Sequence, residues 1–328
     1  MTKEHSAPVI RVDGLTKKYE DRVAVGGITF SVNGGEVFGF LGPNGAGKTT
    51  TIRMLTGLSK PTSGNASIFG FDVRTDIVEA KRYIGVVPEI SNLYEDLTAM
   101  DNLLFMGQLY GLPRNRRREK AEELLNTFGL YERRGDLFRR FSRGMKRALT
   151  ISAALIHDPD ILFLDEPTVG LDVVAARSLR TLVARLRDFG ITVFLTTHYL
   201  EEADLLCDRV AILVKGRIVD IGTPSELKSQ VQREPAIDIG FARAVPDAAR
   251  RLSAALPGLR IIEADDARFR IYGGEPSYVL ARALDFENDC GIRLETINTV
   301  RPTLEDAFMK IAGMGPSVLL MEKGGKNR

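Results

Sequence analysis

The sequence has few cysteines and no long apolar run. Its two cysteines, Cys207 and Cys290, stand far apart without metal-ligand spacing, which favours free thiols in a reducing compartment. No apolar stretch approaches the ~20 residues that a bilayer-spanning helix needs, and the first eight residues lack the apolar core of a secretory signal. We therefore expect a soluble chain, and any membrane that it serves must be crossed by another chain.

Charge of one sign is also scarce overall. The formal net charge is +2 over 328 residues, which gives no global case for nucleic acid or for an acidic partner. Arginine-rich runs at residues 114–118 and 133–140 are expected to be solvated helix faces, with contacts to a partner or to anionic lipid as the alternative. No Asn-Lys-x-Asp segment occurs, which disfavours a switch-type GTPase.

One glycine-rich segment indicates nucleotide binding. Residues 42–50 fit the pattern G-x-x-x-x-G-K-[ST] between an apolar strand, predicted at 36–41, and a predicted helix. Phosphates must lie against backbone N–H groups, so Cβ atoms would obstruct, while a lysine reaches the β- and γ-phosphates and a threonine hydroxyl ligates Mg²⁺. The predicted ATP-binding residues of this loop are Gly42, Pro43, Asn44, Gly45, Ala46, Gly47, Lys48, Thr49 and Thr50.

Two further strand ends carry candidate catalytic side chains. The apolar strand predicted from Ile161 ends in Asp165 and Glu166, and a later strand ends at His198. Because ligands of open α/β sheets gather at the carboxyl ends of strands, we expect these residues to face the glycine-rich loop. Asp165 would hold Mg²⁺ through water, Glu166 would orient or deprotonate the attacking water, and His198 would contact the γ-phosphate.

Tyr19 has both a structural and a functional interpretation. It ends a predicted strand and either stacks on adenine or is half-buried.

A mostly helical segment, predicted from Leu97 to about Ile156 with breaks at Gly111–Pro113 and near Gly135, looks like an insertion into the α/β core. Within it, Ser142 is predicted to cap a helix whose positive end faces whatever lies in front.

In this order the motifs resemble the ATP-binding cassette family, the nucleotide-binding subunits of membrane transporters. The resemblance covers about Val9 to Lys228 and joins the P-loop, the signature segment at Ser142, the strand 161–166, the Gly170-Leu171-Asp172 loop and the switch residue His198. It implies a P-loop NTPase core with an antiparallel β subdomain and an inserted helical subdomain at about 97–157. Two copies, or one copy and a paralogous subunit, would clamp two ATP molecules with Mg²⁺.

The resemblance also assigns roles. Tyr19 matches the adenine-stacking aromatic, Ser142 and Gly144 would cap the γ-phosphate of the partner protomer, and Asp172 would couple the two sites. It implies an integral-membrane permease as a further partner, a position at the cytoplasmic face of the membrane, and no nucleic acid.

Two positions depart from the family pattern. Glu89 stands where the family usually has glutamine, a residue that helps to position Mg²⁺; glutamate still offers an oxygen ligand but adds negative charge. Arg143 stands where the signature usually has glycine and brings both bulk and a cation. These departures favour an alternative function, an ATP-gated dimerisation clamp with weak hydrolysis.

After Pro235 the pattern changes to β-α-β-β-α-β-α, which predicts a small α+β accessory domain of the ferredoxin-like kind over 235–313. Residues 1–8 and 314–328 are expected to be flexible, and 9–230 to form the ATP-binding domain. The helix start at Thr303 resembles the end of ATPase subunits of multidrug and antibiotic-resistance exporters, which indicates export. A soluble cassette ATPase unrelated to transport is the second alternative, disfavoured because the chain has one P-loop and no sustained heptads.

Overall fold

A computed structural model describes residues 8–230, 236–244, 247–300 and 303–313. Its described residues divide into two compact units, the first comprising 8–224 and 311–313 and the second those from Ser225 to Lys310. The expected flexible ends lie outside the described residues except for Pro8, and so does Pro235. The domain limits 9–230 and 235–313 stay predictions.

The first unit is built on a six-stranded sheet whose central strands are apolar throughout. All five residues of β3 and all five of β7 are buried, as expected for strands covered on both faces. Four adjacent pairs are parallel and only the β9–β10 hairpin is antiparallel. In sheet order the strands are β10 (Arg217–Gly222), β9 (Arg209–Val214), β3 (Val37–Leu41), β8 (Thr192–Thr197), β7 (Ile161–Asp165) and β6 (Ile84–Val87).

A second, antiparallel sheet in this unit confirms the predicted β subdomain. Its order is β2 (Arg22–Val32), β1 (Ile10–Tyr19), β4 (Ser63–Ile68) and β5 (Phe71–Asp72). The two sheets share one apolar core, in which Phe30 of β2 lies 5.6 Å from Phe38 and 6.1 Å from Phe194 between ring centroids. Each buried aromatic side chain contributes about 1.5–3 kcal/mol to this packing.

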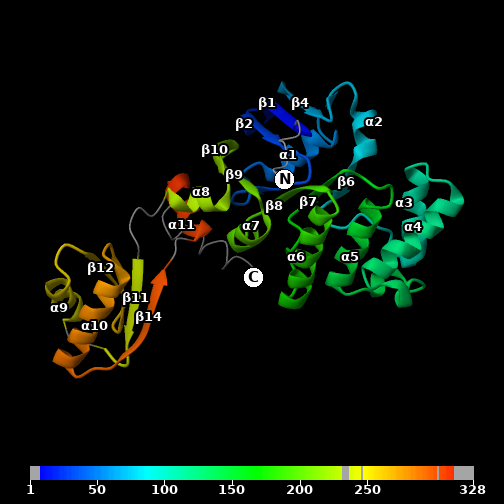
Figure 1. Cartoon of the computed structure of the whole chain (residues 1–328). Coiled ribbons are helices and arrows are strands. Elements are labelled where there is room, and N and C mark those ends of the chain that lie inside the picture. The colour runs from blue at the N-terminus through cyan, green and yellow to red at the C-terminus, as the bar shows by residue number, and fades with distance from the viewer. Residues whose placement is uncertain (1–7, 231–235, 245–246, 301–302, 314–328) are drawn as a thin grey trace, which may run out of the picture. The chain divides into compact units, whose positions relative to one another are not determined.

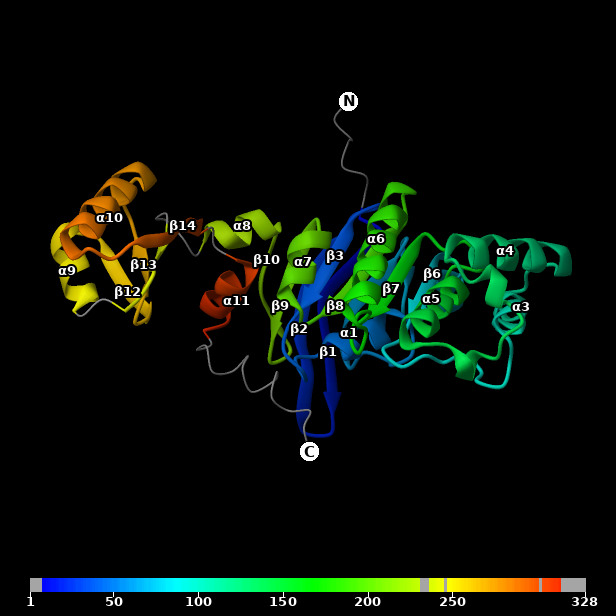
Figure 2. The ribbon, with the colours of Figure 1, turned by 90° about the horizontal axis from the view of Figure 1, so that it is seen from below.

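Helices surround the six-stranded sheet, and three of them form the predicted insertion. In Figures 1 and 2 the inserted helices lie together beside the β6 edge of the sheet. They are α3 (Ala99–Leu109), α4 (Arg114–Thr127) and α5 (Arg143–Ala154). The other helices before Ser225 are α1 (Lys48–Leu55), α2 (Ile77–Ala80), α6 (Val173–Asp188) and α7 (Leu200–Leu206), and α8 (Pro224–Ser229) begins at the division.

The predicted break near Gly135 is longer than the sequence indicated. Residues 128–142 contain only two 3₁₀ turns, at Tyr131–Arg133 and Phe138–Arg140. The reason is that this segment pairs with the start of α3: Phe138 N donates to Leu97 O at 3.0 Å and Ala99 N to Asp136 O at 3.1 Å. These backbone groups are satisfied across the subdomain and are not available for a continuous helix.

The second unit has the predicted β-α-β-β-α-β-α order. Its antiparallel sheet runs β12 (Arg260–Asp265), β13 (Arg268–Tyr272), β11 (Ala236–Phe241) and β14 (Leu294–Val300), the strand order of a ferredoxin-like fold. Its helices are α9 (Ala248–Ala255), α10 (Pro276–Cys290) and α11 (Leu304–Ala312), of which the last two residues are grouped with the first unit. Ile237, Ile239 and Phe241 pack into its separate core. Thr303 and Asp306 cap α11 reciprocally, with the Asp306 N to Thr303 Oγ1 bond at 3.1 Å.

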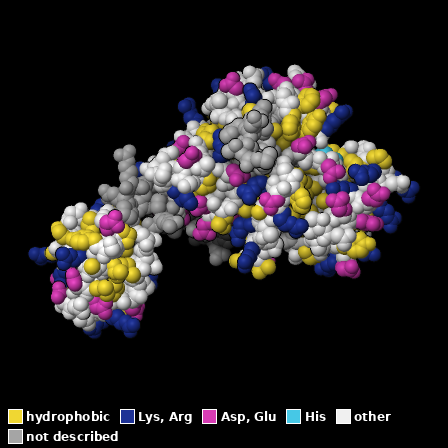
Figure 3. Space-filling view, viewed as in Figure 1, with side chains coloured by type: hydrophobic (Ala, Val, Ile, Leu, Met, Phe, Trp, Pro, Cys, Tyr) yellow, Lys and Arg dark blue, Asp and Glu magenta, His cyan; other side chains and the backbone are white. Residues whose placement is uncertain are grey.

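Charges on the helical insertion are interspersed in sign. Arg118 pairs with Glu122 at 3.1 Å and Lys120 with Glu123 at 2.9 Å along α4. Figure 3 shows basic and acidic side chains mixed over this side of the first unit. The arginine-rich run of α4 is therefore largely a solvated helix face, as expected. Within the described residues, no helix combines the length and the apolar character needed to cross a membrane.

Candidate functional site

The loop between β3 and α1 has a backbone that only glycine allows at two positions. A Cβ on Gly42 would collide with the Leu213 carbonyl oxygen. Gly47 has φ +108°, and a Cβ there would lie 2.6 Å from the Ala24 carbonyl oxygen. The tight turn in front of the α1 N-terminus, where an anion is favoured, therefore depends on these two glycines. This is the geometry that the sequence predicted for phosphate binding.

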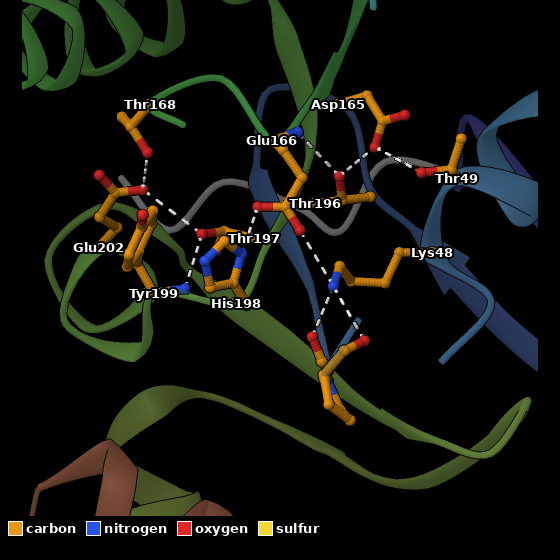
Figure 4. A network of polar contacts seen from close by, with 12 residues as sticks. Lys48, Thr49, Asp165, Glu166, Thr168, Thr196, Thr197, His198, Tyr199 and Glu202 are labelled. Carbon is orange, nitrogen blue, oxygen red and sulfur yellow. Dashed lines mark hydrogen bonds and ion pairs between the residues drawn. The ribbon is translucent and has the colours of Figure 1, made fainter. Parts of the chain in front are cut away.

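Lys48 is buried at the start of α1 and faces three oxygen atoms. Its Nζ donates to Gly42 O at 2.6 Å and to Pro43 O at 3.2 Å, and it lies 3.0 Å from Glu166 Oε1. The side chains of Lys48 and Glu166 are only 5% and 7% exposed. Figure 4 shows the ammonium group held between the loop carbonyls and the carboxylate. The cation predicted to bind phosphate therefore already has an anionic partner.

Thr49 and Asp165 provide a pair of oxygen donors beside this cation. Thr49 Oγ1 donates to Asp165 Oδ1 at 3.2 Å, and Thr196 Oγ1 donates to the same oxygen at 2.6 Å. Among the described residues no group of three or more His, Cys, Asp or Glu side chains forms a metal cage. Mg²⁺ bound with nucleotide phosphates needs only one or two protein oxygens, since water and phosphate supply the rest. The hydroxyl and carboxylate fit that requirement.

Glu166 has a strained backbone and two cationic or hydrogen-bonding neighbours. Its φ is +46°, a left-handed value that is uncommon for a non-glycine residue. Its Oε2 accepts a hydrogen bond from His198 Nδ1 at 2.8 Å. Burial alone would raise the pKa of the Glu166 carboxyl, but the His198 hydrogen bond and the Lys48 charge outweigh burial and lower that pKa. Glu166 is therefore a carboxylate at neutral pH, and strain of this kind is often concentrated at functional sites.

A further buried carboxylate, Glu202 of α7, was not identified from the sequence. Its Oε2 accepts hydrogen bonds from Thr168 at 2.7 Å and from Thr197 at 3.4 Å, and its Oε1 lies 3.7 Å from Arg180 Nη1. It thereby joins the segment after Glu166 to the residue before His198 (Figure 4). Burial raises the pKa of Glu202, and its hydrogen bonds and the Arg180 charge only partly offset that effect.

We expect Glu202→Gln to change how stability depends on pH. Because the folded-state pKa of Glu202 is raised, the folded chain binds more protons than the unfolded chain between its ordinary value of 4.5 and the raised value. As pH rises through that window, the free energy of unfolding of the wild type should therefore fall relative to that of the glutamine variant. The fall should be about 1.4 kcal/mol for each unit of the pKa difference. Urea unfolding of both proteins at pH 4.5 and pH 7.5 measures this. A stability difference that is the same at both pH values would contradict it.

The remaining predicted residues lie outside this cluster. Ser142 and Asp172 cap α5 and α6, accepting from Met145 N at 3.3 Å and Ala175 N at 2.8 Å. Both residues and Gly144 line one groove of about 610 Å³ between the two helices. In the described part of the chain, no hydrogen bond or ion pair joins them to Lys48 or Thr49.

Two predicted residues are exposed. Tyr19 is 46% exposed at the end of β1, with Lys17 Nζ 4.9 Å from its ring centroid. Glu89 is exposed in the segment that follows β6, and no hydrogen bond or ion pair of the described residues joins it to Thr49 or Asp165. The structure therefore does not bring Glu89 into contact with the other proposed metal ligands.

Comparison with known proteins identifies the family. A family model described as ABC transporter matches residues 25–169. The chain is 37% identical over 308 residues to the linearmycin resistance ATP-binding protein LnrL of Bacillus subtilis (strain 168), covering 93% of this chain and 98% of that protein. The chain belongs to the ABC transporter family. As an ATP-binding subunit of that family it is an ATPase.

Two further matches agree with this ABC assignment. The daunorubicin/doxorubicin resistance ATP-binding protein DrrA of Streptomyces peucetius is 38% identical over 305 residues, with 93% of this chain and 92% of that protein covered. A solved structure described as an ATP binding subunit of an ABC transporter has a TM-score of 0.62 and 32% identity, covering 68% of this chain and 92% of that one. The predicted ABC ATPase fold is confirmed.

Proposed function

We propose that this ABC ATPase works at the cytoplasmic face of a membrane and drives export of a drug or antibiotic through a separate permease. Two relatives that align along most of the chain carry the names of resistance proteins, which supports export. The described residues contain no helix that could span a bilayer, so a partner chain would provide the crossing. The single observation that carries the ATPase mechanism is the convergence of Lys48, Thr49, Asp165, Glu166 and His198 at one sheet edge.

The active form that we propose is a dimer, either of two copies or with a paralogous subunit. Ser142, Gly144 and Asp172 gather at the ends of α5 and α6 and do not touch the Lys48 cluster within one chain. A second protomer would bring its Ser142 and Gly144 to the γ-phosphate held by Lys48. The exposed ring of Tyr19 would stack on adenine.

ATP binding begins with an exchange of partners at Lys48. The nucleotide phosphates would lie along the backbone N–H groups of residues 42–50, and Lys48 would turn from Glu166 to the β- and γ-phosphates. Thr49 and Asp165 would hold Mg²⁺, with Glu89 as a further oxygen ligand after a local movement. Bound Mg²⁺ supplies neutralisation of phosphate charge.

Hydrolysis would use Glu166 and His198 together. Glu166, released from Lys48, would accept the proton of a water aimed at the γ-phosphate. His198 Nδ1 donates to Glu166 Oε2, which fixes the carboxylate and leaves Nε2 for the phosphate. A hydrogen bond from Nε2 to a phosphate oxygen would link this side chain to the nucleotide while Nδ1 stays on Glu166.

The proposal is tested by purifying the full chain together with membranes and assaying the bound material. We expect a multispanning chain to co-purify, and we expect ATP hydrolysis that stops when EDTA removes Mg²⁺ and resumes when Mg²⁺ is restored. A fully active chain that never associates with a membrane protein would contradict the transport role. Hydrolysis unaffected by EDTA would contradict the metal role of Thr49 and Asp165.

A further inference from the structure

Arg147 of α5 is a buried cation whose hydrogen bonds go to main-chain carbonyls. Its side chain donates from Nη1 to Pro88 O at 2.6 Å, from Nη2 to Glu166 O at 2.9 Å and from Nε to Pro167 O at 2.7 Å. The residue is only 8% exposed. One guanidinium therefore connects α5 to the end of β6 and to the end of β7, which precede the segments of Glu89 and Glu166.

This arrangement is specific to arginine. A buried charge is tolerated only when its hydrogen-bonding groups are satisfied, and the planar fork of a guanidinium can donate in several directions at once. Burial lowers the pKa of Arg147, while the negative charges of Asp165 and Glu89 act in the opposite sense. A lysine ammonium donates from one nitrogen and cannot reproduce the fork of three nitrogens that reaches Pro88 O, Glu166 O and Pro167 O together.

Arg147 is hydrogen-bonded to the strained backbone of Glu166. Glu166 holds φ +46°, and its N–H donates to Thr196 O and to Thr196 Oγ1, both at 3.1 Å. Its carbonyl accepts from Arg147. The left-handed conformation is thus fixed on both sides, by β8 at the amide nitrogen and by α5 at the carbonyl oxygen. Such strain persists only where the surroundings over-determine it.

The same helix presents the signature residues. Ser142 caps α5 five residues before Arg147, which is about 7.5 Å along the helix axis. The guanidinium thus links the helix that begins after Ser142 to the main chain of Glu166 and Pro167.

We propose that Arg147 is a positioning residue that couples the placement of the signature helix to the catalytic geometry of Glu166. This inference rests on the proposed function, because it assumes that Ser142 caps the γ-phosphate in a partner protomer while Glu166 acts in its own. When Ser142 engages the partner's nucleotide, Arg147 holds the Glu166 carboxylate at the geometry for water attack. Arg147 would act through the main chain, because its hydrogen bonds go to the carbonyls of Pro88, Glu166 and Pro167.

The test separates turnover from binding. In Arg147→Lys we expect kcat for ATP to fall by about ten- to a hundredfold, the loss typical of an ångström-scale misplacement of a catalytic group. Affinity for a fluorescent ATP analogue should stay within about twofold, because the Lys48 loop is untouched. A role in stability alone would change the unfolding midpoint without this split between kcat and binding. Arg147→Gln is the second variant, because the glutamine side chain has no charge but still donates hydrogen bonds.

A matched control is Arg117→Lys in the same helical insertion. Arg117 donates from Nη1 to Gln108 at 2.9 Å, away from both catalytic segments, so its kcat should stay close to wild type. Wild-type kcat in either Arg147 variant would overturn the coupling, and so would a failure of both variants to fold. An inactive wild-type chain would instead contradict the proposed function, so the two failures can be told apart.

Discussion

Lys48→Ala is expected to weaken ATP binding by about ten- to a hundredfold and to abolish hydrolysis. The ammonium group would be lost from the γ-phosphate, and a hydrogen bond to a charged group is worth about 1.5–3 kcal/mol. The loop would lose the hydrogen bonds from Lys48 to Gly42 O and Pro43 O, but main-chain bonds from Gly216 N to Ala46 O at 2.9 Å and from Ala46 N to Pro43 O at 3.1 Å would remain. Equilibrium binding of a fluorescent ATP analogue and a phosphate-release assay measure the two effects.

Lys48→Ala should also raise the pKa of the Glu166 carboxyl. In wild type, Lys48 is one of the groups that lower the pKa of Glu166, so its removal leaves that buried carboxyl with His198 alone. Lys81→Ala is the matched control, since Lys81 is exposed in the same unit and distant from the loop in sequence. Unchanged ATP affinity in Lys48→Ala would remove Lys48 from its assigned role.

Much of the fold follows from local patterns in the sequence. The apolar runs at β3 and β7 and the glycine–lysine loop specify a strand, a turn and a helix within a few residues of one another. Parallel order then places Asp165 and His198 at the same edge. The caps at Ser142 and Asp172 are equally local, because each side chain bonds an N–H three residues ahead.

The contacts that the sequence did not reveal join distant segments through groups without a sequence signal. Arg147 reads as one more basic helix residue, but its acceptors are carbonyls 19, 20 and 59 residues away. Glu202 binds Thr168 across 34 residues. The family pattern alone placed Glu89 at the metal. In the structure Glu89 is exposed, because the chain leaves the sheet at the end of β6. Neither periodicity nor a motif encodes such contacts.

The ion pair of Lys48 with Glu166 explains how two opposite charges can be buried in this site. Both groups are needed near phosphate, yet a lone charge of either sign would be costly to bury. Their ion pair satisfies both charges, and in the proposed exchange His198 would keep the carboxylate in place. In the proposed mechanism, nucleotide binding and the release of Glu166 from its ion pair would be one event.

Glu166→Gln should separate those two roles. We expect hydrolysis to fall by about 10²–10⁴-fold, because glutamine cannot take a proton from water. ATP binding should be retained or tightened, since the change removes a negative charge beside the γ-phosphate and frees Lys48 from its ion pair. The bound but uncleaved nucleotide should then hold two protomers together. Size-exclusion chromatography with light scattering, with and without Mg-ATP, should show a doubled mass only when ATP is present.

The control for this experiment is Glu201→Gln, which changes an exposed carboxylate of α7 and should leave turnover unchanged. Stability supplies an independent check of the substitution itself. Because the folded-state pKa of Glu166 is lowered, its carboxylate stabilises the wild type above the ordinary value of 4.5, and that contribution is lost as pH falls through the lower folded-state value. The glutamine variant should lack this acid-side loss. A variant that binds ATP, hydrolyses none and remains a monomer would rule out assembly through Ser142 and Gly144 of a second protomer, while leaving the Lys48 site intact.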